Sequence, residues 1–197
     1  MSTTKNIFSV LPWNIAGELT WSEYREGYRK AADTLVSTLL DSDRGFLADI
    51  GARFGMVYPI MFLYRHYTEI AFKELLALCG MTSLVSGTNI SGHDLRALWS
   101  KVLECVEAVQ GADARQDFQT TFEQSIELFE RLDPRGDGFR YPKNVKGKAQ
   151  WDSVFEIDIA RINLRIKSLG QLCDDLRSEL KQMLDPGADV SDRYYFY

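Results

Sequence analysis

The sequence is poor in the residues from which most metal and thiol sites are built. It holds two histidines and three cysteines in 197 residues, without a CxxC pair. A zinc site normally takes four Cys or His ligands, or three and a water, so we expect no metal. Cys79, Cys105 and Cys173 each lie on or beside an apolar helical stripe. We therefore expect reduced core thiols rather than disulfides.

Several other signatures are missing. The chain has no P-loop, GxGxxG or GxSxG motif, and we expect no cofactor. The first ten residues lack the basic start and apolar run of a secretory signal, and there is no stretch of about 18 apolar residues. We expect a cytoplasmic protein that does not enter a membrane.

The overall composition is that of an ordinary globular domain. Hydrophobic residues make up 45% and charged residues 26%, and the length predicts a single helical domain over residues 1–197. The net charge of −5 excludes a general nucleic-acid binder, so any contact with nucleic acid must be local.

Apolar residues recur at spacings of three and four along the first half of the chain, which indicates helices. After an irregular lead-in (1–17), Thr20 and Glu23 fit a capping box. The buried stripe of this helix is predicted to be Trp21, Tyr24, Tyr28, Ala32, Leu35 and Leu39. The apolar segment 46–78 contains Pro59, so it is either one kinked helix or, as we prefer, a short helix and a longer one from Pro59 to about Gly80.

Three further helices are predicted. Ser91 opens one that Gly111 ends, and Asp113 caps another that ends before Pro134. Asp152 is expected to cap the last, which carries a coiled-coil-like seam. The seam comprises Phe155, Ile159, Ile162, Ile166, Leu169, Cys173, Leu176, Leu180 and Met183. A basic Gly/Pro loop (133–150) precedes this helix and a polar, aromatic tail (186–197) follows it. The prediction is an all-α bundle of five or six helices.

Three polar segments interrupt this apolar pattern. The first is Arg65, His66, Glu69 and Lys73, which share one face of the most apolar helix. Buried charge is costly unless it is paired. The face is therefore a solvated ion-paired surface, an internal polar network, or the lining of a site.

The second segment is His93, Asp94 and Arg96 in a first helical turn, where free N–H groups favour anions. It is either a plain helix cap or a phosphate or carboxylate cradle. The third is Phe139-Arg140-Tyr141-Pro142 with Lys143 after it. An arginine between aromatics grips phosphate or stacks on bases, or it anchors a loop to the bundle.

These residues resemble a known family. RHYTEIAFKELL, then GHDLRALW, then FRYP in a basic loop and a long closing helix, over roughly residues 57–185, are similar to HEPN-like helical proteins of prokaryotes. That resemblance implies a helical bundle that commonly dimerises. It also implies a place in antiviral defence or toxin–antitoxin systems, often as a metal-independent ribonuclease. The usual Arg-x4-6-His signature is lacking, which implies a non-catalytic or rearranged module.

Three functions follow as hypotheses. The leading one is a dimeric interaction or regulatory module, HEPN-like, of a prokaryotic defence or stress system, which binds a partner protein and contacts RNA or nucleotide. The second is a metal-independent endoribonuclease with a composite site. In it His66, His93, Arg65 and Glu69 are catalytic, and Arg96, Arg140 and Lys143 bind phosphate. The third is a sensor of a small anionic ligand at the His93 turn. All require the three segments to converge in space.

Overall fold

The computed structural model describes residues 21–41, 50–89, 91–144, 146–151 and 156–185, and these form five helices and no strand. The helices are α1 (Trp21–Leu40), α2 (Ile50–Thr82), α3 (Leu95–Gln110), α4 (Ala112–Leu132) and α5 (Ile159–Leu184). The predicted all-α bundle is confirmed. None of these helices combines the length and the apolar character that a membrane crossing requires.

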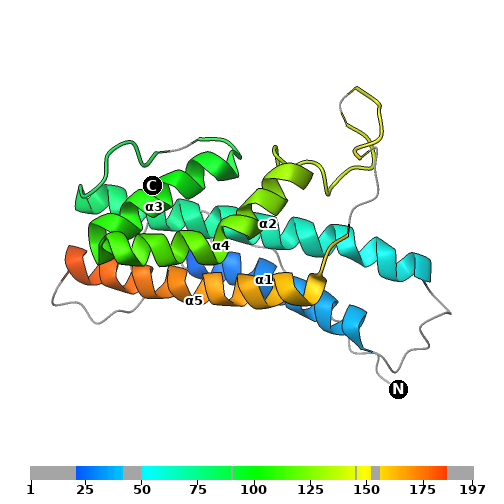
Figure 1. Cartoon of the computed structure of the whole chain (residues 1–197), viewed down its shortest axis with the longest axis horizontal. Helices are drawn as coiled ribbons and strands as arrows, with labels where there is room; N and C mark the ends of the chain where they lie inside the picture. The colour runs from blue at the N-terminus through cyan, green and yellow to red at the C-terminus, as the bar shows by residue number, and fades with distance from the viewer. Residues whose placement is uncertain (1–20, 42–49, 90, 145, 152–155, 186–197) are drawn as a thin grey trace, which may run out of the picture.

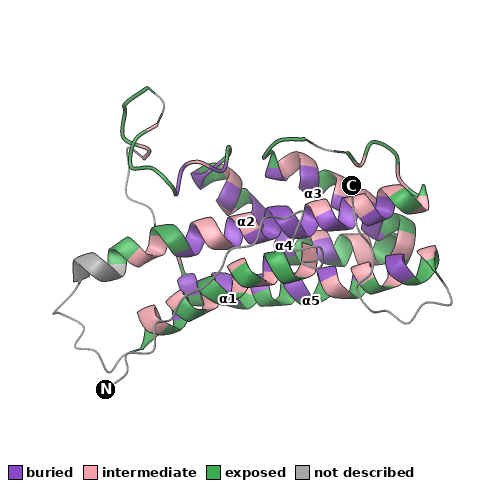
Figure 2. Ribbon diagram, turned by 180° about the vertical axis from the view of Figure 1, so that it is seen from behind, coloured by how far each residue is buried: buried purple, intermediate pink, exposed green. Residues whose placement is uncertain are grey.

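Helix α2 is the central element of the bundle (Figure 1) and contacts α1, α3 and α5. Its middle turns are buried on nearly every side, as Figure 2 shows and as suits its apolar sequence. The side chains of Tyr64, Tyr67, Phe72 and Leu75 are almost wholly buried there. Polar residues on this helix therefore lie inside the protein, where they need partners.

Proline does not divide α2, contrary to our preferred interpretation. The helix runs unbroken through Pro59 and continues past Gly80 to Thr82. The hydrogen bond that Pro59 cannot make would have ended on the carbonyl of Gly55, and both residues are exposed. Water can therefore satisfy that carbonyl, so the cost of the proline is small enough for one long helix to persist.

The buried stripe of α5 was predicted well and that of α1 less well. Tyr24 is 44% exposed, whereas the buried line of α1 passes through Arg25, Ala32 and Val36. In α5 the seam from Ile159 to Leu180 packs inside the bundle, and only Met183 at its end is exposed. All three cysteines are free and buried, as expected.

Three helix starts differ from the prediction. Helix α3 begins after Ser91, with Asp94 as its N-cap accepting from the N–H of Ala97 at 2.9 Å. Helix α4 follows Gly111 directly, so Asp113 lies in its first turn. Helix α5 begins at Ile159, with Asp158 as cap, and residues 156–158 are not helical. The expected caps Thr20 and Asp152 and the seam residue Phe155 lie outside the described residues.

The loop between α4 and α5 has two parts. Its first part packs on the bundle, because Asp133 and Phe139 are buried and the indole N–H of Trp151 donates to the Leu132 carbonyl at 3.0 Å. Its second part projects away (Figure 1) as a turn closed by Asn144, which bonds to Lys146 and Lys148.

Candidate functional site

The three polar segments converge on one cavity of about 250 Å³. Helix α2 supplies Arg65, His66 and Glu69, the turn before α3 supplies His93, and the loop after α4 supplies Arg140. Tyr28 of α1, Phe62 of α2 and Gly136 of the loop complete its lining. The two histidines of the chain thus share a single site.

Arg65 holds the three segments together. Its guanidinium is 2% exposed and donates to the carbonyls of Asp133 and His93, each at 2.8 Å, and to Glu69 Oε2 at 3.2 Å. Three of the five N–H groups of the side chain are thereby used. Because these bonds tie α2 to the loop and to the turn before α3, Arg65 acts mainly by positioning.

Glu69 lies at the centre of the polar contacts. Its Oε1 accepts hydrogen bonds from Lys73 Nζ and His93 Nδ1, both at 2.8 Å. Burial opposes ionisation of this carboxyl, but the bonds from Lys73 and His93 prevail and lower its pKa. An ionised carboxylate only accepts, so His93 must donate its Nδ1 proton and leaves Nε2 free for proton exchange.

His66 has an apolar environment by comparison. Its ring stacks on Phe62 with centroids 5.7 Å apart and meets the edge of Tyr28 at 4.5 Å. Burial lowers the pKa of His66, and the charge of Glu69 only partly offsets this. Burial and a hydrogen bond with Tyr24 raise the pKa of Tyr28 to about 12. Near neutral pH, His66 is therefore a neutral imidazole beside a neutral phenol.

Arg140 supplies the cation of the cavity. Its guanidinium lies 5.7 Å from the ring centre of Phe62 and 5.8 Å from that of Tyr141. Within the described part of the chain it forms no ion pair with a carboxylate. Its charge is held between two aromatic rings at the edge of the cavity, where an anion can reach it.

Two predicted phosphate-binding residues do not line this cavity. Arg96 of α3 forms an ion pair with Glu123 of α4, and Glu123 also accepts a hydrogen bond from the indole of Trp99. Arg96 therefore connects α3 to α4. Lys143 is exposed in the projecting part of the loop. Asp94 is an ordinary helix cap, and His93 precedes the helix rather than lying in its first turn.

Sequence reasoning missed Tyr28, Phe62, Asp133 and Gly136. Phe62 is four residues before His66, the spacing at which two side chains share a helix face, so it could have been found. The others come from separate elements and left no such signal.

Among the described residues, no group of three or more His, Cys, Asp and Glu side chains is arranged to hold a metal ion. Comparison with protein-family models, curated proteins and solved structures finds no match for this chain. The resemblance to HEPN-like proteins therefore stays a prediction from sequence motifs.

Proposed function

We propose that the cavity binds a phosphodiester and that the protein is an endoribonuclease that needs no metal ion. The observation that supports this most is that both imidazoles of the chain line one cavity together with Arg140. Histidine exchanges protons near neutral pH, and a fixed cation stabilises charge that develops on phosphate.

The environments of the two histidines suggest their roles. His66, neutral against Phe62 and Tyr28, accepts the proton of a ribose 2′-hydroxyl. The 2′-oxygen attacks phosphorus, and the bond from phosphorus to the 5′-oxygen breaks. His93, held by Glu69 through Nδ1, donates a proton from Nε2 to that leaving oxygen. The products are a 2′,3′-cyclic phosphate and a 5′-hydroxyl, so atoms and charge balance.

Arg140 and Arg65 have separate roles. Arg140 contacts the non-bridging phosphate oxygens, because it has no carboxylate partner among the described residues. Arg65 maintains the cavity, and its remaining two N–H groups are available to the same phosphate. A cavity of about 250 Å³ suits a phosphate and part of one nucleoside rather than a duplex.

The test uses the full chain, labelled single-stranded RNA and an excess of EDTA. We expect cleavage that leaves cyclic phosphate ends, and none of a DNA strand of the same sequence, which lacks the attacking hydroxyl. His66→Ala and His93→Ala should each reduce the rate by about 10²–10⁴-fold. Lys167→Ala, an exposed cation on α5 outside the cavity, is the matched control. Equal cleavage by parent and both histidine variants would show a contaminant and refute the proposal.

A second candidate is a regulatory module that binds RNA or nucleotide without cleaving it. Tyr141, which is 59% exposed beside Arg140, favours this, since a cation and an aromatic face grip nucleic acid without proton transfer. RNA binding that Arg140→Gln weakens, with no cleavage by the parent chain, would select this alternative.

The prokaryotic defence role and the homodimer remain proposals that rest on the motif resemblance. The seam of α5 from Ile159 to Leu180 is buried within one chain, so a dimer would have to form through another surface. Light scattering tests the dimer, and a 22.5 kDa species would contradict it.

A further inference from the structure

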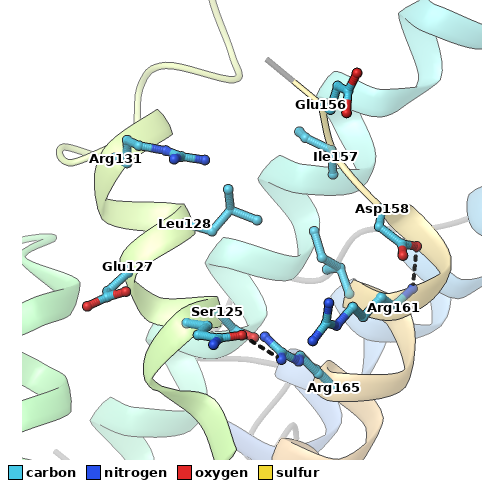
Figure 3. A pocket seen from close by; sticks show the side chains of 11 residues that line it. Ser125, Glu127, Leu128, Arg131, Glu156, Ile157, Asp158, Arg161 and Arg165 are labelled. Atoms are coloured by element: carbon cyan, nitrogen blue, oxygen red, sulfur yellow. Dashed lines mark hydrogen bonds between the residues drawn. The ribbon is translucent and has the colours of Figure 1, made fainter.

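A second cavity lies between α4 and the first turns of α5 (Figure 3). Its volume is about 470 Å³, almost twice that of the histidine cavity, and the two share no lining residue. Pockets that enclose small organic molecules have volumes of roughly 300–1,000 Å³. By size, this second cavity and not the first suits a complete small ligand.

Three arginines face this space. Arg131 extends from α4 toward α5, and Arg161 and Arg165 extend from α5 toward α4 (Figure 3). Arg165 Nη2 donates to the side-chain oxygen of Gln124 at 2.9 Å, which fixes its direction. In the ranges that the structure describes, neither Arg131 nor Arg161 forms an ion pair. Two guanidinium groups therefore lie at the cavity without an ion-pair partner among the described residues.

Among the described residues, the acidic residues of the lining form no ion pair with these arginines. In Figure 3, Glu127 points away from the cavity and Glu156 points toward its outer edge. Asp158 caps α5, where its carboxylate accepts from the N–H of Arg161 at 2.9 Å. In Figure 3 the arginine side chains extend across the space between the two helices, whereas the carboxylates lie at its margin.

The floor of the cavity is apolar apart from one hydroxyl. Leu128, Ile157 and Ile162 supply aliphatic surface. Ser125 also lies there, but it is only 4% exposed and its buried hydroxyl presents almost no surface to a ligand. The floor therefore offers a ligand an apolar surface.

We propose that this cavity binds a small organic phosphate, independently of the histidine cavity. The arginines hold the phosphoryl oxygens, since a guanidinium matches phosphate geometry with two parallel hydrogen bonds. The apolar body of the ligand lies on Leu128 and Ile157. Inorganic phosphate would contact the arginines alone. An uncharged aromatic alcohol would contact only the apolar surface of Leu128 and Ile157.

Calorimetry with the full chain at low ionic strength tests this, using naphthyl phosphate, inorganic phosphate and naphthol as probes. Naphthyl phosphate should bind more tightly than either of the other two. Arg131→Gln and Arg161→Gln should each weaken it by about tenfold or more. Lys167 lies on α5, as Arg161 does, but outside the lining. The dissociation constant of Lys167→Gln for naphthyl phosphate should stay within about twofold of that of the parent chain. All three positions are exposed, so the variants should fold.

Arg140→Gln and His93→Ala then distinguish the two cavities. If they abolish binding of naphthyl phosphate while Arg161→Gln does not, the ligand occupies the histidine cavity and this inference is wrong. It is equally overturned if naphthyl phosphate does not bind at millimolar concentration, or if naphthol binds as tightly. RNA cleavage plays no part in these measurements, so the proposed ribonuclease can fail while this binding site stands.

Discussion

Helix α2 carries two buried ionic clusters, and they differ in what they contact. One joins Arg25 of α1, Glu74 of α2, and Asp174 and Arg177 of α5. The other is the group around Arg65 and Glu69. Glu69 and Glu74 are five residues apart, which at about 100° per residue places them on different sides of the helix.

The cluster around Arg25 reaches solvent only through Asp174 and Arg177, and its centre is buried. Arg25 Nε lies 2.9 Å from Glu74, Ser22 donates to Glu74 at 2.9 Å, and Tyr67 covers the guanidinium at 5.9 Å. None of its charged groups lines either cavity. The cluster around Arg65 instead opens on the histidine cavity. Burial of charge alone therefore does not indicate a site, because only one of the two clusters lines a cavity.

The largest expected effect should be common to both clusters. Arg65→Met removes the cation beside buried Asp133 and one of the cations beside Glu69, and Arg25→Met leaves Glu74 with Arg177 at 3.6 Å as its cation. Each should lower the free energy of unfolding by about 3–5 kcal/mol, measured by urea denaturation. A loss below about 1 kcal/mol at either position would mean that its carboxylates find other partners or take up protons.

Changes in the two clusters should differ in their effect on RNA cleavage even where they have the same effect on stability. In Glu69→Gln, an amide NH2 group replaces one carboxylate oxygen, and it cannot accept the hydrogen bonds that Arg65, Lys73 and His93 donate to Glu69. The imidazole of His93 therefore loses its orientation. We expect a fall in kcat/KM on RNA of about tenfold to a hundredfold. The matched change Glu74→Gln should leave kcat/KM of the folded fraction unchanged. Equal losses in the two variants would indicate that Glu69 acts only through stability.

Gly136 tests how tightly the open cluster is packed. Its φ of +75° is in the left-handed region, and an added Cβ would lie 2.8 Å from Arg65 Nη1. Gly136→Ala should cost about 1–3 kcal/mol and reduce activity by moving Arg65. Gly147 has a φ of +74° but open space around it, so Gly147→Ala isolates the backbone strain. If both variants lose the same stability, the contact with Arg65 contributes nothing.

The fold could be predicted because its signals are local. Apolar spacing within α5 is a property of one segment, and it located the buried face of that helix correctly. Pro59 misled us because its cost depends on whether water reaches the Gly55 carbonyl, which is a property of tertiary position.

The candidate site was predictable in its histidines and in Arg140, since polar residues stood out against apolar surroundings. The sequence did not predict which cations line the cavity. Arg96 and Arg140 were both predicted to bind phosphate, yet Glu123 of another helix pairs with the first. Partners of this kind are decided by packing between elements, and no spacing along the chain encodes them.

The smallest expected effect is a pH dependence that only the open cluster should show. Burial lowers the pKa of His66 in the folded chain from its usual 6.5, so the unfolded chain binds more protons between the two values. The contribution of neutral His66 to the free energy of unfolding should thus be fully present above about pH 6.5. It should be lost as the pH falls through that interval. His66→Phe should flatten the profile of urea midpoints between pH 5 and 7, whereas Arg25→Met should not. A His93→Gln series assigns any remaining slope, and an unchanged slope in His66→Phe would show that His66 is as well solvated folded as unfolded.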